Sequence, residues 1–226
     1  MYTTGVRILV WMCVLTYLMQ HIYYPLVEKL LGLAYIGHQN FSVFQFVTYA
    51  FVHGDVFHIL INMLMLVIFG SHIEKFLGIN KLFTVFTLSV ITGGIFEMIS
   101  NMMAIHSITG TYFPPIAMDF YDQVKYSMEY GSEFTSTFNR ITIGASAGVF
   151  GCMIAFTTMF PKERIGFFFL PFSFSARLVI VCYVAMEIYS ALFRSIPNVA
   201  HFAHIGGALA GLLVGLYWRK TLRTRK

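Results

Sequence analysis

Six long apolar segments constrain this chain more than any other feature, because each is long enough to cross a lipid bilayer as an α-helix. A spanning helix needs about 20 mostly apolar residues, since the hydrocarbon core of a bilayer is roughly 30 Å thick. The segments do not alternate between apolar and polar residues, as the strands of a membrane β-barrel would. The sequence therefore predicts an all-α, polytopic membrane protein that forms one domain over residues 1–226. The predicted spans are residues 6–24, 57–76, 82–103, 141–160, 176–193 and 199–218.

The composition excludes an ordinary soluble domain. Hydrophobic residues make up 58% of the chain and charged residues only 11%, whereas a soluble domain carries about 25% charged residues. The first apolar segment contains Arg7 near its start, as a cleaved signal peptide would. It ends in the bulky Tyr23, Tyr24 and Pro25, whereas a cleavage site needs small residues. We therefore expect this segment to be retained as a membrane anchor.

The distribution of Lys and Arg predicts the orientation of the chain. If both termini are cytoplasmic, 11 of the 15 Lys and Arg residues fall on the cytoplasmic side, as the positive-inside rule requires. The basic residues 219–226 then lie beside anionic lipid, so the net charge of +5 does not predict a nucleic-acid partner. The expected location is the bacterial plasma (inner) membrane. The polar loop 104–140 is expected to face outward, with little part in catalysis.

Polar residues on three different predicted spans are expected to meet in one layer of the membrane. His58 and Asn62 are four residues apart, so they share one face of a helix. Ser146 lies in the run Gly144-Ala-Ser-Ala-Gly148, and His204 lies in the run His201-Phe-Ala-His204. In the predicted topology all three spans begin at the outer face, and each of these groups comes only a few residues after its span begins. Ionisable residues at such depth are costly and point to function.

These residue types match the needs of nucleophilic catalysis. A serine nucleophile needs a base within hydrogen-bond reach, and His204 is the candidate base for Ser146. The oxyanion that develops on a substrate carbonyl needs hydrogen-bond donors, which His58, Asn62 and the Ser146 backbone N–H can supply. Small residues let membrane helices approach closely. We therefore expect Gly144, Gly148 and Gly151 to meet Gly207 and Gly211, and to bring serine and histidine together without a third acid.

Three acidic residues lie singly within the apolar segments. Glu97 and Glu187 are expected to be capped or paired structural acids, and Glu74 is expected to tie a helix end.

The motifs together resemble the rhomboid family of intramembrane serine proteases. The resemblance implies a six-helix bundle that cleaves transmembrane protein substrates with a Ser146–His204 dyad, without a metal or an organic cofactor. It further implies that His58 and Asn62 stabilise the oxyanion, and that His53, Gly144, Gly148, Gly207 and Gly211 support the site structurally. The matching residues are Phe44–Gln45, His53–His58, Asn62–Met63, Gly70, Glu74, Gly78, Gly144–Ser146, Ala203–Gly207 and Gly211.

One residue departs from the family pattern, and three other readings compete. Ala147 stands where the family's serine motif has Gly, which affects the expected local geometry. A catalytically silent relative that binds membrane clients is the main alternative. A metalloprotease that uses His53, His58, His201 and His204 lacks the His-Glu-x-x-His motif of zincins. A transporter would commonly carry internal repeats, and none is present. The sequence leaves the substrate and the oligomeric state open.

Overall fold

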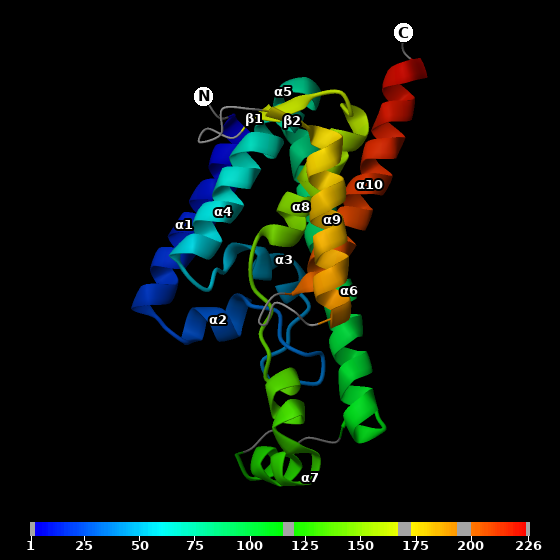
Figure 1. Cartoon of the computed structure of the whole chain (residues 1–226). Helices are drawn as coiled ribbons and strands as arrows, with labels where there is room; N and C mark the ends of the chain where they lie inside the picture. The colour runs from blue at the N-terminus through cyan, green and yellow to red at the C-terminus, as the bar shows by residue number, and fades with distance from the viewer. Residues whose placement is uncertain (1–2, 115–119, 167–172, 194–199, 225–226) are drawn as a thin grey trace.

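The computed structural model describes residues 3–114, 120–166, 173–193 and 200–224 as a bundle of helices (Figure 1). The N- and C-termini lie at the same end of the bundle, and helix α7 (Phe120–Phe138) lies at the opposite end (Figure 1). Helix α1 (Thr4–Ile22) is followed by a second crossing in which α4 (Val56–Met65), the π-helical turn η2 (Leu66–Gly70) and α5 (Ser71–Leu77) form one continuous rod. The later long helices are α6 (Ile79–Thr109), α8 (Ser146–Met159), α9 (Ala176–Phe193) and α10 (His201–Thr224).

Within the described residues, four of these helical segments are long and apolar enough to cross a membrane. They are α1, the rod Val56–Leu77, α6 and the stretch His201–Leu222 of α10. Helix α8 and the apolar part of α9, Ile180–Ser190, are shorter than a full span. The chain is an integral membrane protein with a helical fold, while the number of six crossings stays a prediction.

The predicted outer loop 104–140 is largely helical. Residues 104–109 continue α6, which reaches 31 residues before Gly110 ends it in a left-handed conformation. Helix α7 then fills most of the remainder, and residues 115–119 lie outside the described part. The ring of Phe134 stacks on the rings of Tyr126 and Phe138. Gly131, with a φ of +79°, interrupts α7, so the segment consists of two helical parts joined at a kink.

The segment between α1 and α4 folds into a compact support. It contains α2 (Leu26–Leu31), α3 (Gln45–Thr48) and the 3-10 turn η1 (Tyr49–Phe51). Gln45 is fully buried at its centre, and its carbonyl oxygen accepts hydrogen bonds from the backbone of Ala34 and Ser42. Its amide donates to Leu30 and Asn40. One buried amide thereby satisfies backbone groups that no helix pairs, as non-helical backbone within a membrane protein requires.

The opposite end of the bundle is closed by local ties. The Glu74 carboxylate on α5 accepts hydrogen bonds from the backbone N–H groups of Gly5 and Val6, at 2.8 and 3.0 Å, at the start of α1. A carboxylate at a helix N-terminus satisfies unpaired donors and complements the helix dipole. The expected helix-end tie is therefore present, and its partner is α1. A short hairpin of β1 (Arg164–Gly166) and β2 (Ser173–Ser175) connects α8 to α9 at the same end.

Helix α8 is the centre of the fold. Twelve of its 14 residues are buried, although most are apolar and would also tolerate lipid. It packs directly on α10, since a Cβ atom added to Gly207 or Gly211 would overlap the backbone of Ala147 or Gly151. The two backbones therefore approach as closely as small residues allow. This contact fixes the position of α10 relative to the first residue of α8.

Candidate active site

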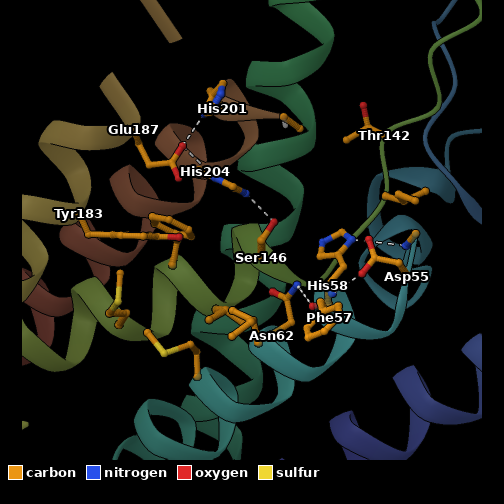
Figure 2. A pocket seen from close by; sticks show the side chains of 18 of the residues that line it. Asp55, Phe57, His58, Asn62, Thr142, Ser146, Tyr183, Glu187, His201 and His204 are labelled. Atoms are coloured by element: carbon orange, nitrogen blue, oxygen red, sulfur yellow. Dashed lines mark hydrogen bonds and ion pairs between the residues drawn. The ribbon is translucent and has the colours of Figure 1, made fainter. Parts of the chain in front are cut away.

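A cavity of about 780 Å³ lies between α4, α8, α9 and α10. Figure 2 shows Ser146 at its centre, with His204 and Glu187 on one side and His58 and Asn62 on the other. The structure thus brings together polar groups from four helices that are far apart in the sequence. The rest of the wall is mainly apolar, as is usual for pockets that bind organic ligands. Its apolar lining includes Ile61, Met65, Val149, Phe150, Met153 and Met186.

Ser146 and His204 are in direct contact. His204 Nε2 lies 2.7 Å from Ser146 Oγ, within hydrogen-bond distance (Figure 2). The side chain of His204 is only 10% exposed. With the proton of a neutral imidazole on Nδ1, Nε2 accepts the hydroxyl proton of Ser146, which is the arrangement of a nucleophile and its base.

Ser146 is the first residue of α8, which differs from the prediction of a helix starting at residue 141. Residues 141–145 are not helical, and Gly144 among them has a φ of +117°, a conformation that L side chains rarely adopt. A Cβ on Gly144 would also lie 2.7 Å from His58 Nε2. Gly144 therefore allows the turn of the backbone into α8 and leaves room for His58. The start of α8 places its unpaired backbone N–H groups next to the Ser146 side chain.

Three hydrogen-bonded contacts from the α1–α4 segment hold the chain before Ser146 in place. Leu33 and Thr142 exchange two backbone hydrogen bonds of 2.9 Å, and Gly144 N–H donates to the Tyr49 carbonyl at 2.9 Å. The backbone N–H of Ala145 donates to His53 Nε2 at 3.4 Å. The segment between α1 and α4 is thus the support of the nucleophile.

His53 is a buried neutral imidazole. Its Nδ1 donates to the Phe51 carbonyl at 3.3 Å, while Nε2 accepts from Ala145, so one tautomer serves both contacts. Burial of the ring, followed by its proximity to His58, lowers the pKa of His53 to about 4. A protonated ring would turn Nε2 into a donor that opposes the Ala145 N–H. His53 therefore supports the site through the backbone and does not face the cavity.

His58 and Asn62 lie on the α4 wall of the cavity. Asp55 caps α4 by accepting the His58 backbone N–H at 2.9 Å, which is the preferred role of Asp at a helix start. His58 Nδ1 accepts a long hydrogen bond, 3.4 Å, from Gly54 N–H, so the Nε2 proton points toward Gly144. The Asn62 amide donates one hydrogen bond to the His58 carbonyl at 2.9 Å and keeps a second N–H.

Two aromatic residues that the sequence analysis did not single out orient the base. The Phe150 ring stacks on the His204 imidazole, with centroids 4.5 Å apart and an angle of 14° between the planes. The ring of Tyr183 on α9 also stacks on Phe150, with ring centroids 4.8 Å apart. Phe150 is four residues after Ser146 and therefore lies on the same face of α8. That spacing is the signal by which the sequence could have identified it.

Glu187 is paired, as expected for a single acid in an apolar helix, and one of its two neighbours is the base. Its Oε2 lies 2.6 Å from His201 Nδ1 and 3.1 Å from His204 Nδ1 (Figure 2). Among the described residues, these three form the one group of His, Cys, Asp and Glu side chains whose potential metal-ligating atoms come within 4.8 Å. His53 and His58 pair separately, with ring centroids 5.1 Å apart. The four histidines therefore do not form one metal site.

The glycines have more specific contacts than the sequence predicts. Gly207 packs on Ala147 and Gly211 packs on Gly151, as two of the expected close approaches require. Gly148 instead faces α6, where a Cβ would lie 2.6 Å from the Phe86 ring, because each helical residue is turned about 100° from the one before it. Gly144 precedes the helix and faces His58. The expectation that Gly144 and Gly148 meet α10 is therefore wrong.

Comparison with known proteins places this architecture in a family. A model of the Rhomboid domain matches residues 40–221. The chain is 25% identical over 177 residues to Rhomboid protein 1, mitochondrial, of Saccharomyces cerevisiae, covering 78% of this chain and 42% of that protein. It is 26% identical over 187 residues to RHOMBOID-like protein 1 of Arabidopsis thaliana, covering 82% of this chain and 36% of that protein.

A third similar protein is Presenilin-associated rhomboid-like protein A, mitochondrial, of Danio rerio. It is 27% identical over 177 residues, which cover 76% of this chain and 38% of that protein. The matched part of this chain thus spans about two fifths of the length of these relatives. Because the family match extends over most of the chain and includes the whole cavity, the chain belongs to the rhomboid family.

Proposed function

We propose that the protein is an intramembrane serine endopeptidase that cleaves transmembrane proteins with Ser146 and His204. The observation that carries the proposal is the 2.7 Å contact between His204 Nε2 and Ser146 Oγ inside a cavity that also holds His58 and Asn62. A role in binding clients needs none of these four groups in this arrangement. The chemistry needs neither a metal nor an organic cofactor.

The reaction begins when Ser146 Oγ attacks the carbonyl carbon of the scissile peptide bond. His204 Nε2 takes the hydroxyl proton and then gives it to the leaving amine nitrogen as the C–N bond breaks. Water then attacks the acyl-enzyme ester and loses its proton to His204. The ester bond breaks, and Ser146 Oγ recovers the proton from His204. Both half-reactions pass through a tetrahedral oxyanion.

Donors on two sides of Ser146 stabilise that oxyanion. The Nε2–H of His58 and the second N–H of Asn62 approach from α4, and the backbone N–H of Ser146 approaches from the start of α8. Fixed donors of this kind need no reorganisation when charge develops. The positive end of the α8 dipole adds to the same effect. Gly144 keeps this space open, because any side chain there would meet His58.

The substrate is proposed to be a membrane-spanning protein segment, cut near the outer face of the membrane, with both termini of the enzyme in the cytoplasm. The two termini share one end of the bundle (Figure 1), and the Lys and Arg distribution favours the cytoplasm for that end. A helical peptide bond is shielded by its own hydrogen bonds, so Gly or Pro near the scissile bond should favour cleavage. Bacterial origin stays a prediction, since the three relatives come from yeast, a plant and a fish.

The test is cleavage of a panel of single-span proteins in liposomes, together with labelling by a serine-reactive phosphonate. Ser146→Ala and His204→Ala should each abolish cleavage, and Ser146→Ala should also abolish labelling. Ser89→Ala is the matched control, because Ser89 is buried on α6 with no hydrogen-bond partner among the described residues. A folded Ser146→Ala protein that cleaves at the wild-type rate would disprove the proposal.

The same experiment distinguishes a protease from a catalytically silent relative. Wild-type protein that cleaves no member of a broad panel and resists the phosphonate would favour a relative that binds membrane clients. Product masses that place the cut at the cytoplasmic end would reject the proposed depth while leaving the serine chemistry intact.

A further inference from the structure

Glu187 is the nearest acidic group to the base, and it is the one acidic residue that helix α9 supplies to the cavity. It lies on α9, is 5% exposed, and points its carboxylate into the space between His201 and His204 (Figure 2). A buried acid in an apolar helix carries a cost in free energy that requires a partner. Both Nδ1 atoms of these histidines converge on its Oε2.

The tautomer of His204 makes this contact specific. His204 Nε2 must accept the Ser146 proton, so the single proton of the neutral ring belongs on Nδ1. That nitrogen is buried, and no acceptor among the described residues forms a well-aligned hydrogen bond with it. Glu187 Oε2, at 3.1 Å, is the acceptor in reach, although the N–H does not point straight at it.

Charge adds a second effect. When His204 takes the serine proton, it becomes a cation in a mainly apolar cavity, where an unpaired charge is costly. A carboxylate 3.1 Å from its Nδ1 offsets that charge. His201, whose Nδ1 lies 2.6 Å from the same oxygen, holds the carboxylate in position.

We propose that Glu187 is a positioning residue that completes a Ser146–His204–Glu187 relay by fixing the tautomer of His204 and balancing its charge. The inference deepens the proposed function and rests on it. His201 serves as the anchor of Glu187 and has no direct role in the proton transfer.

The first test compares Glu187→Gln, Glu187→Asp and a matched control in liposomes with the full chain. Glu97→Gln is that control, because Glu97 is also buried and also contacts α10, through a 3.3 Å hydrogen bond from the Ala203 backbone N–H. Removing the charge of the aspartate in a soluble serine protease lowers kcat by about 10⁴. We expect a loss of about 10²–10⁴ for Glu187→Gln with KM unchanged. Glu187→Asp should recover part of kcat, and Glu97→Gln should keep it within a few fold.

A role of Glu187 in structure alone predicts a different outcome. Glu187→Gln and Glu97→Gln would then lower kcat and melting temperature to the same extent, and this would overturn the proposal. A kcat of Glu187→Gln close to that of wild type would also overturn it. A third outcome would also overturn the proposal: a chelator activates the wild type but does not activate Glu187→Gln. That result would identify a metal site at Glu187, His201 and His204.

A second measurement does not depend on catalysis and so separates this inference from the proposed function. Nitrogen-15 NMR of labelled histidine reports which ring nitrogen carries the proton, and His204→Gln identifies the signal. We expect Nδ1–H in the wild type and a mixture of tautomers in Glu187→Gln. A wild-type His204 protonated on Nε2 would refute the relay, even in a protein that cleaves substrates. The expected tautomer in a protein that cleaves nothing would refute only the protease assignment.

Discussion

The two sides of the cavity are built in opposite ways. On one side, α8 and α10 pack backbone to backbone through Gly207 and Gly211, and almost every residue of α8 is buried. On the other side, α4 carries His58 and Asn62 but leaves large apolar side chains open: Phe57 is 79% exposed and Leu60 is 57% exposed. The nucleophile and its base thus share one tightly packed contact, while the candidate oxyanion donors stand on a wall that faces lipid.

This difference shows where the protein needs precision. Proton transfer depends on a fixed distance between two atoms, and the α8–α10 contact leaves no space in which that distance could change. Binding a protein segment needs a wall that a substrate can reach, and the exposed face of α4 offers one. Changes on the α8–α10 side should therefore affect folding and activity together, and changes on the α4 side should affect activity alone.

The largest effect is expected from Gly211→Leu. The new side chain would overlap the backbone of Gly151, and overpacking of a tight core costs about 1–3 kcal/mol, occasionally more. We expect a lower melting temperature and complete loss of cleavage. Leu213→Ala is the control, because Leu213 is also on α10 and is 59% exposed. It should change neither the melting temperature nor the cleavage rate. Wild-type stability of Gly211→Leu would mean that the two helices do not touch as described.

On the α4 side, Asn62→Ala should lower kcat and leave the melting temperature nearly unchanged. Loss of one oxyanion donor costs about 10²–10³ in a soluble serine protease, and His58 should keep the loss near the lower end of that range. Initial cleavage rates in liposomes measure it, with Leu15→Ala, on the exposed face of α1, as the control. Equal rates for Asn62→Ala and wild type would remove Asn62 from the proposed oxyanion site.

His53 contacts both sides of the cavity. Its lowered pKa predicts that the stability of the protein depends on pH. Its folded pKa of about 4 lies below the usual 6.5 because the ring is buried, so the unfolded chain binds the proton first as the pH falls. The contribution of neutral His53 to the free energy of unfolding is complete above pH 6.5. It falls by about 1.4 kcal/mol per pH unit as the pH decreases from the unfolded to the folded pKa. Melting temperatures at pH 7 and pH 5 measure the loss, which should be smaller in His53→Gln. An identical loss in both proteins would contradict this assignment.

The smallest effect is expected at the position that departs from the family pattern. Ala147→Gly removes a methyl group that packs against Gly93 and costs about 1 kcal/mol through the flexibility of Gly in a helix. Cleavage should equal or exceed that of the wild type, because the change relaxes the backbone beside Ser146. Cleavage assays on folded protein decide this. A large fall in turnover would show that Ala147 sets a geometry of its own.

The sequence by itself determined the fold class and four of the residues that meet in the cavity. Long apolar runs predict membrane helices, because a bilayer offers the backbone no partner other than itself. The order of His58, Asn62, Ser146 and His204 along three such runs predicted their convergence, since the depth of a residue in a span follows from its position in the sequence.

Only the tertiary structure decided which neighbours orient these groups. Glu187 looks like any single acid in an apolar helix until the rotation of α9 brings it to 3.1 Å from His204. The same holds for two supports of the backbone before Ser146, which come from Leu33 and Tyr49. Depth is a property of one helix, whereas facing direction and loop contacts depend on how several helices pack, and no local pattern in the chain encodes that packing.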